Sequence, residues 1–238
     1  MKRFWREVTL EPDGNGWQVA LDGRRVKTAQ ANAQVAPTRA LGEALGAEWR
    51  AQGDEVSAAK FAFRDMADYA IDIVAIDPGD AIRRILAYAE GDTLCYRAEP
   101  DEPLAARQRQ AWEPLLQAAE DAHHVKFERI VGILHRPQPA ATLAVLRTHL
   151  ETLDPFALAS LQTLASLAAS LVIGLAALQP GADAAALFAA SNLEEDWQAE
   201  QWGWDFEAEA TRARKLATFR GAVQFAALTQ ESFEPRVG

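Results

Sequence analysis

The sequence has few residues of several chemically informative kinds. Cys95 is the only cysteine among 238 residues. An internal disulfide is therefore excluded, and the chain fits a reducing compartment. Lys2, Arg3 and Arg6 place charge close to Met1, and no apolar run follows them, which predicts that no secretory signal is present. We expect a cytoplasmic bacterial protein.

Motifs for common cofactors are also missing. The sequence has no Gly-rich phosphate loop, no dinucleotide fingerprint, no Gly-x-Ser-x-Gly and no zinc spacing. Glu120 and His123 match the Glu-x-x-His spacing of carboxylate-bridged metal bundles, but such sites need two copies of that motif. The sequence therefore predicts no metal, no cofactor and no small-molecule ligand.

One pair of carboxylates keeps an enzymatic alternative open. Asp68 and Asp72 lie four residues apart and share a face of a predicted helix, so they are candidates for acid–base chemistry in a pocket of the helical domain. Arg64, four residues before Asp68, favours instead an ordinary ion-paired helix face.

No lysine or arginine occurs between Arg147 and Arg212, although the chain has 24 basic residues in total. Ten acidic residues fall in this segment, and the formal net charge of −10 resides there. Nucleic acids and anionic membranes require clustered basic residues, so neither is an expected partner. The acidic residues are Glu151, Asp154, Asp183, Glu194, Glu195, Asp196, Glu200, Asp205, Glu207 and Glu209.

The segment 193–206 combines three of the seven tryptophans with five carboxylates. Ser191 and Glu194 fit a capping box, which gives some of the acids a structural role. On a continuous helix, Leu193, Trp197 and Trp204 share one side, whereas Trp202 and Phe206 lie on the other. All of them can be buried only if both sides of the helix are covered or if the helix breaks at Gly203. Otherwise one aromatic group faces solvent, where tryptophan is a common interface anchor.

A second segment resembles a membrane span. No residue from Pro155 to Ala182 is charged, and Leu158–Leu178 is long enough to cross a bilayer. However, no basic residue flanks the segment closely, and Ser166 and Ser170 dilute it. A helix that is apolar on all sides is also typical of the centre of a helical domain. We therefore favour burial, with a membrane-associated protein as the alternative.

Periodicity divides the chain into two parts, which predicts an α+β fold. Residues 1–60 contain alternating segments joined by turns, notably Asp22-Gly23, and then an amphipathic helix that Thr38 caps. Residues 61–238 are helical in period almost throughout. We predict a small N-terminal antiparallel β domain (1–60) with a covering helix, followed by a larger all-α domain (61–238).

Several motifs in this order resemble the α-subunit-specific assembly chaperones of F-type ATP synthase. The resemblance covers almost the whole chain. Cys95, Trp197 and Arg64-Asp65 depart from the family pattern. The motifs are Leu21-Asp22-Gly23-Arg24, Glu48-Trp49-x-x-Gln52, Ala70-Ile71-Asp72, Asp92-Thr93-Leu94-Cys95-Tyr96-Arg97, Trp112-x-Pro114-Leu115 and Trp202-Gly203-x-Asp205-x-Glu207-Ala208.

This resemblance implies a non-enzymatic function. Members of the family bind the free α subunit of the synthase and prevent its aggregation until the β subunit replaces them; the eukaryotic relatives act in the mitochondrial matrix. An unassembled subunit exposes apolar surface, which an acidic, aromatic face of a chaperone can cover transiently. The predicted partner-binding residues are Glu194, Glu195, Trp197 and Trp202, with Trp49 and Asp92 as secondary candidates.

Overall fold

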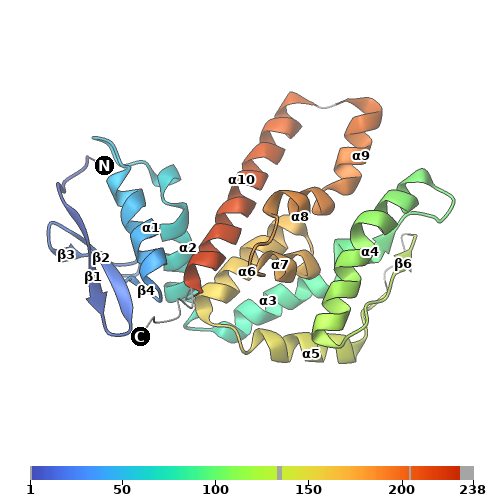
Figure 1. Ribbon diagram of the computed structural model, residues 1–238, viewed down its shortest axis with the longest axis horizontal. Coiled ribbons are helices and arrows are strands. Elements are labelled where there is room, and N and C mark those ends of the chain that lie inside the picture. Colours follow the sequence, from blue (N-terminus) through green and yellow to red (C-terminus); the bar gives the residue numbers. More distant parts are fainter. Residues whose placement is uncertain (1, 133–135, 204, 231–238) are drawn as a thin grey trace, which may run out of the picture.

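A small antiparallel sheet forms the N-terminal end of the computed structural model, which describes residues 2–132, 136–203 and 205–230 (Figure 1). The central strand β2 (Gly16–Leu21) pairs with β1 (Val8–Asp13), β3 (Arg24–Arg25) and β4 (Val35–Ala36). The turn between β2 and β3 is the predicted Asp22-Gly23 hairpin, in which both residues have positive φ. Helix α1 (Arg39–Arg50) packs on this sheet, and the Thr38 hydroxyl accepts a hydrogen bond from the Leu41 amide as predicted.

Aromatic side chains fill the core beneath this sheet. The centroid of the Trp49 ring lies 5.0 Å from that of Trp5, in an edge-on arrangement, and 4.6 Å from that of Phe61. Phe225, from the far end of the chain, is buried in the same cluster. The N-terminal core therefore includes side chains from beyond residue 60, and the domain boundary at this position stays a prediction.

The remainder of the described chain is mainly helical, as the α+β prediction requires. Helix α6 lies at its centre and contacts α3, α7 and α10. After α1 the helical elements are η1 (Ala58–Lys60), α2 (Ala62–Tyr69), the π-helical turn η2 (Ala70–Val74), α3 (Pro78–Glu90), η3 (Thr93–Cys95), α4 (Pro103–His123), α5 (Ala140–Leu150), α6 (Pro155–Ala168), α7 (Leu171–Ala177), α8 (Ala184–Ser191), α9 (Leu193–Trp202) and α10 (Phe206–Thr229).

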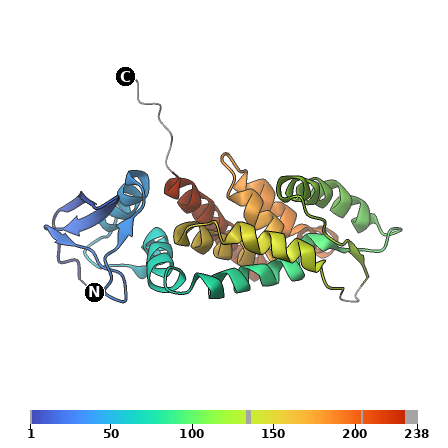
Figure 2. The same cartoon turned by 90° about the horizontal axis from the view of Figure 1, so that it is seen from below.

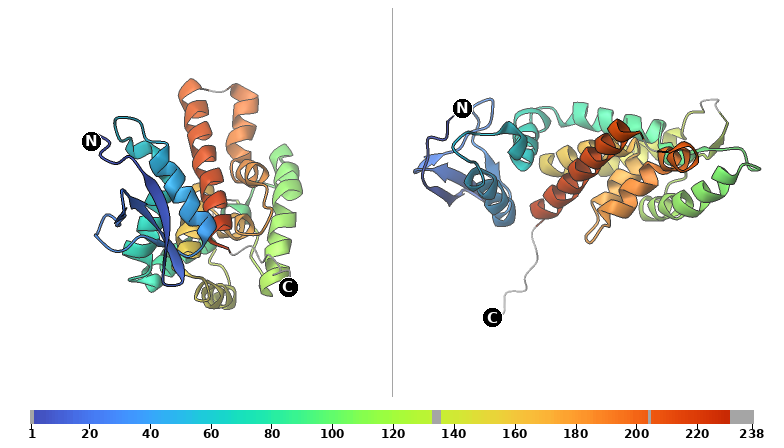
Figure 3. Two further views of the ribbon diagram at one scale, coloured as in Figure 1. Left: turned by 60° about the vertical axis from the view of Figure 1, so that its left-hand side comes forward. Right: turned by 90° about the horizontal axis from the view of Figure 1, so that it is seen from above.

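The molecule is elongated, with the sheet at one end and α4 at the other (Figure 2). A short parallel sheet beside α4 joins β5 (Tyr96–Arg97) to β6 (Ile130–Val131). Helices α9 and α10 lie side by side and project from the body as a hairpin (Figure 3). The other end of α10 reaches the N-terminal unit, where the Thr38 hydroxyl donates to the Leu228 carbonyl.

The uncharged segment forms two buried helices, so the prediction of one long helix is wrong. Ala169 adopts a left-handed conformation that ends α6, and the Ser170 hydroxyl then caps α7 by accepting from the Ile173 amide. Most side chains of both helices belong to the main hydrophobic core, which confirms the preference for burial. No helix among the described residues has the length and hydropathy needed to span a membrane.

One further local expectation, the capping box of Ser191 and Glu194, needs correction. Ser191 ends α8 instead of capping α9, and Glu194 forms no capping box. Helix α4 runs from Pro103 to His123 and contains Pro114 in its interior.

Candidate partner-binding site

The turn that joins α9 to α10 begins with a glycine, Gly203. Gly203 ends α9 with φ +88° and ψ 160°, a backbone conformation that is essentially restricted to glycine. The Asp205 carboxylate then caps α10 by accepting from the Ala208 amide at 3.2 Å. The helix therefore breaks at Gly203, but the break does not bury the aromatic side chains, because Trp202 and Phe206 are both exposed. Trp204, predicted to share a helix side with Leu193 and Trp197, lies outside the described residues.

Two aromatic side chains lie at this turn. Trp202 and Phe206 are each 82% exposed, the largest exposed fractions among the exposed large hydrophobic side chains of the described chain. Large aromatic side chains in solvent are unfavourable without packing partners, and aromatic residues are enriched at interaction sites.

A groove of about 630 Å³ lies between the two helices, and Trp202 is part of its lining. Glu195 on α9 and Glu207 on α10 line it, together with Asp205 at the turn. Arg212 on α10 donates to Asp196 on α9 at 2.8 Å, which ties the two helices together. Arg212 and Lys215 also line the groove, so its walls combine three carboxylates and two basic groups with the Trp202 ring.

Trp197 and Glu194, predicted as partner contacts, also make contacts with α4. The Arg107 guanidinium lies 4.3 Å from the centre of the Trp197 ring, and the same side chain pairs with Glu200 at 2.6 Å. The Gln108 amide donates to Glu194 at 2.6 Å. Both residues help to fix α9 on the body, although Glu194 is itself exposed, as are Glu195 and Trp202.

The secondary candidates Trp49 and Asp92 are buried and lie far from the hairpin along the chain. Trp49 belongs to the N-terminal core. The Asp92 carboxylate accepts hydrogen bonds from the Leu94 and Val172 amides, each at 3.0 Å. Burial raises the pKa of Asp92 to about 6, although these hydrogen bonds oppose the change. The structure thus brings Glu194, Glu195, Trp197 and Trp202 together on α9 and places Trp49 and Asp92 elsewhere.

Asp68 and Asp72, the carboxylates of the enzymatic alternative, fasten the N-terminal unit to the helical part. Asp72 accepts from the Thr28 hydroxyl at 2.6 Å, the Gln30 amide at 3.0 Å and the Asn32 side-chain amide at 2.8 Å. Asp68 accepts from the Gln34 side chain and from the Ala29 amide. These donors all come from the segment between β3 and β4, so both carboxylates have structural partners.

Burial affects these two carboxyl groups differently. It raises the pKa of Asp68 above its usual value, because burial outweighs the hydrogen bonds from Gln34 and Ala29 and the nearby charge of Arg64. Burial also acts to raise the pKa of Asp72, but three hydrogen bonds to its charged form together lower it. Asp72 is therefore held as a carboxylate, as expected of a structural acceptor.

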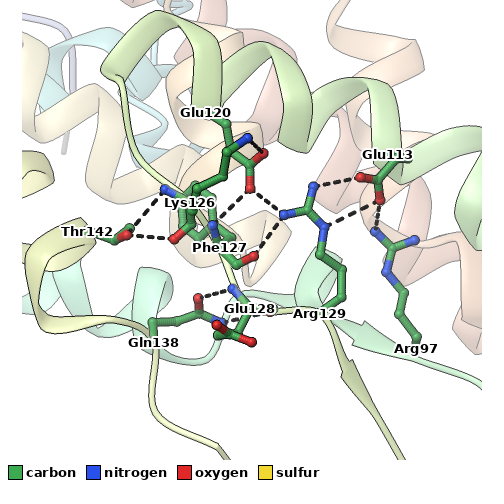
Figure 4. A network of polar contacts seen from close by, with 9 residues as sticks. All are labelled: Arg97, Glu113, Glu120, Lys126, Phe127, Glu128, Arg129, Gln138 and Thr142. Atoms are coloured by element: carbon green, nitrogen blue, oxygen red, sulfur yellow. Dashed lines mark hydrogen bonds and ion pairs between the residues drawn. The ribbon is translucent and has the colours of Figure 1, made fainter.

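The candidate metal residues serve other roles. Glu120 accepts from Arg129, from Lys126 at 2.8 Å and from the Phe127 amide at 2.9 Å (Figure 4). The His123 ring packs against His149 with 4.5 Å between centroids. Over residues 2–132, 136–203 and 205–230, no cluster of three potential metal-binding side chains occurs.

Sequence reasoning missed the ion-pair network that joins α4 to β5 and β6. Glu113 accepts from Arg129 at 2.6 Å and from Arg97 at 3.1 Å, while Arg129 also donates to Glu120 (Figure 4). Glu113 and Glu120 are seven residues apart and share a helix face, which is the only local signal. Their arginine partners come from separate loops and strands, which no local pattern connects.

Known proteins resemble this chain over most of its length. The family model described as "ATP12 chaperone protein" matches residues 2–120. The mitochondrial protein atp12 of Schizosaccharomyces pombe is 22% identical over 214 residues, which cover 85% of this chain and 74% of the relative.

Solved structures are also similar. Atp12 from Paracoccus denitrificans is 34% identical, with a TM-score of 0.91 over 96% of this chain and 98% of its own. A protein from Agrobacterium tumefaciens is 35% identical, with the same TM-score over 96% of this chain and 86% of its own. With this extent of similarity in sequence and fold, the chain belongs to the ATP12 chaperone family.

Proposed function

We propose that this protein, a non-enzymatic assembly chaperone, binds the free α subunit of the F-type ATP synthase through its α9–α10 hairpin. The bound α subunit is kept from aggregating until the β subunit replaces the chaperone. The observation that carries this proposal is the pair of aromatic side chains, Trp202 and Phe206, that are 82% exposed at the end of a hairpin whose groove includes the carboxylates of Glu195, Asp205 and Glu207.

The hairpin suits transient binding for two physical reasons. Its aromatic groups supply apolar contact area, and tryptophan is enriched among residues that dominate binding energies. Its carboxylates, Glu195 and Glu207 among them, attract basic surface and accelerate association. A modest apolar contact with electrostatic steering allows fast binding and displacement by a subunit with a larger interface.

The predicted partner-binding residues of α9 fall into two groups, direct contacts and residues that position the helix. We propose that Glu195 and Trp202 touch the α subunit directly, and that Glu194 and Trp197 position α9 through Gln108 and Arg107. Binding through Trp49 and Asp92 stays a prediction; both are buried, so their substitution is expected to act through folding.

The test compares a double variant, Trp202→Ala with Phe206→Ala, against Phe4→Ala, which removes another aromatic group that is 65% exposed. We expect the double variant to fold normally and to bind purified α subunit at least about tenfold more weakly, since each lost aromatic contact removes about 1–2 kcal/mol. It should also lose suppression of α-subunit aggregation, measured by light scattering. Equal affinity of both variants and the wild type would remove the hairpin from the binding site.

A further inference from the structure

A small basic pocket lies between α4 and the β5–β6 sheet, on a protein whose net charge is −10. Its volume is about 160 Å³, enough for one small functional group and too little for a nucleotide. Three arginines and one glutamate line it, and its remaining walls are mainly apolar. The lining residues are Arg97, Ala98, Pro100, Ala105, Arg109, Glu113, Arg129 and Val131.

Positive charge exceeds negative charge in the network around this pocket. Glu113 is shared by Arg97 and Arg129, with N–O distances of 3.1 and 2.6 Å. Glu120 is likewise shared by Arg129 and Lys126 (Figure 4). Each carboxylate therefore has two cationic partners. The Arg129 guanidinium donates hydrogen bonds to both carboxylates, whereas, within the described chain, the Arg97 guanidinium donates only to Glu113.

Arg97 is held almost completely out of solvent without a full set of partners. Its side chain is 10% exposed, and its guanidinium packs 5.3 Å from the centre of the Trp112 ring. Nη2 donates to Glu113, whereas Nε is buried without a hydrogen-bond partner and Nη1 donates to no described residue. Burying a charged donor without an acceptor is costly, so an arginine in this state favours an added oxygen ligand.

Arg109 supplies a second donor at the mouth of the same pocket. It lies one helical turn before Glu113, a spacing at which a salt bridge is expected, yet it forms none with a described residue. Glu99, on the adjoining loop, is exposed and also forms no ion pair with either arginine in the described chain. The Arg109 guanidinium is therefore available to a ligand.

We propose that this pocket binds a single oxyanion group, a carboxylate or a phosphate, through the Arg97 and Arg109 guanidiniums. Planar guanidinium donors match the oxygens of both groups. Ala98, Pro100 and Val131 then surround the carbon or ester stem that carries the group. This site is chemically opposite to the acidic hairpin and does not depend on it.

The test follows the side-chain Nε–Hε signals of arginine by NMR in the intact protein. Sodium phosphate and sodium acetate are titrated separately, and each replaces sodium chloride so that the ionic strength stays constant. We expect the Arg97 signal to shift and to reach saturation. The anion whose titration reaches its midpoint at the lower concentration is the preferred ligand, phosphate or carboxylate. Arg109→Gln should raise that midpoint at least about tenfold, because one charge-assisted contact is lost.

Arg107→Gln is the matched control, since Arg107 lies on the same helix but pairs with Glu200 and Trp197. It should leave the midpoint unchanged. Arg109→Lys keeps the positive charge but loses the planar guanidinium with its paired donors, and it should give an intermediate midpoint. Non-saturable shifts, or shifts equal in the wild type and Arg109→Gln, would overturn the proposal. Backbone amide spectra of each variant verify that it is folded.

Discussion

Asp92 is a single buried side chain that joins two distant segments. One carboxylate oxygen accepts from the Leu94 amide in η3, and the other accepts from the Val172 amide at the start of α7, which is 80 residues away in sequence. A carboxylate at a helix N-terminus interacts favourably with the exposed amides there. Complete burial opposes the charge, and the pKa of Asp92 rises from 3.8 to about 6.

The raised pKa of Asp92 predicts a pH-dependent stability. The folded chain holds the proton more tightly than the unfolded chain, so the contribution of this group is fully present below about pH 4 and is lost as the pH rises through 6. A shift of this size corresponds to about 3 kcal/mol. Between pH 4 and 7 the free energy of unfolding of the wild type should therefore fall, relative to Asp92→Asn, by up to that amount. Chemical denaturation at several pH values measures it, and parallel curves would contradict it.

At the scale of elements, the shape of the hairpin depends on Gly203. Its φ of +88° is unfavourable for any residue with a Cβ atom, although no atom lies within 4 Å of the position that a Cβ would occupy. The constraint is therefore in the backbone and not in packing. Because the turn positions Trp202 relative to Phe206, a change in its geometry should alter the apolar surface that the hairpin presents.

Gly203→Ala should destabilise the hairpin by about 1–3 kcal/mol, the usual cost of a strained backbone conformation. Amide hydrogen exchange in α9 should accelerate accordingly, while α3 and α6 keep their protection, because the strain is local. Gly221→Ala in α10 is the control: it lies within the helix with open space around it, and alanine favours a helix by about 1 kcal/mol. Equal exchange rates in both variants would argue against strain at Gly203.

Elements with local signals could be predicted, and those fixed by distant contacts could not. Asp22-Gly23, Thr38 and Gly203 act on their immediate neighbours, so the hairpin, the α1 cap and the possible helix break were visible in the sequence. Ala169, which divides the uncharged segment, has no such signal, because alanine favours helix continuation. The short β5–β6 sheet pairs residues more than thirty positions apart and also escaped prediction.

In the candidate site, too, features with a local sequence signal could be predicted, and features that depend on distant contacts could not. Charge segregation and the tryptophans identified α9, because both are properties of composition. The local pattern could not separate the exposed Trp202 from Trp197, which packs under Arg107 of another helix. Nor could it show that Trp49 and Asp92 are buried.

Across the whole molecule, Asp68 and Asp72 connect the N-terminal unit with the helical part. Asp72→Ala would leave three donors, on Thr28, Gln30 and Asn32, without their acceptor, and should cost about 2–4 kcal/mol of unfolding free energy near neutral pH. Because the pKa of Asp72 is lowered, the advantage of the wild type should shrink as the pH falls below about 4. Asp65→Ala, at an exposed position in the preceding helix α2, should change stability by less than about 0.5 kcal/mol. Similar denaturation midpoints for both variants would contradict this structural role.

The unequal charge distribution predicts how the whole protein meets its partner. Acidic residues concentrate in α9 and in the first turn of α10, whereas the rest of α10 is basic. Electrostatic attraction at the acidic end of the hairpin should therefore govern the rate of association with the α subunit, and the apolar contacts should govern dissociation. Raising the salt concentration from about 10 mM to about 1 M shortens the Debye length from about 30 to about 3 Å. The association rate constant should then fall at least about tenfold, with little change in the dissociation rate.

Surface-plasmon resonance with Glu195→Gln and Glu207→Gln combined should show a weaker salt dependence than the wild type. Glu90→Gln, an exposed acid at the end of α3, should retain the full dependence. If salt instead changes mainly the dissociation rate, and equally in both variants, then charge acts within the bound complex and the hairpin carboxylates do not steer its formation. The two rate constants therefore separate the electrostatic role of the hairpin from the apolar role of Trp202 and Phe206.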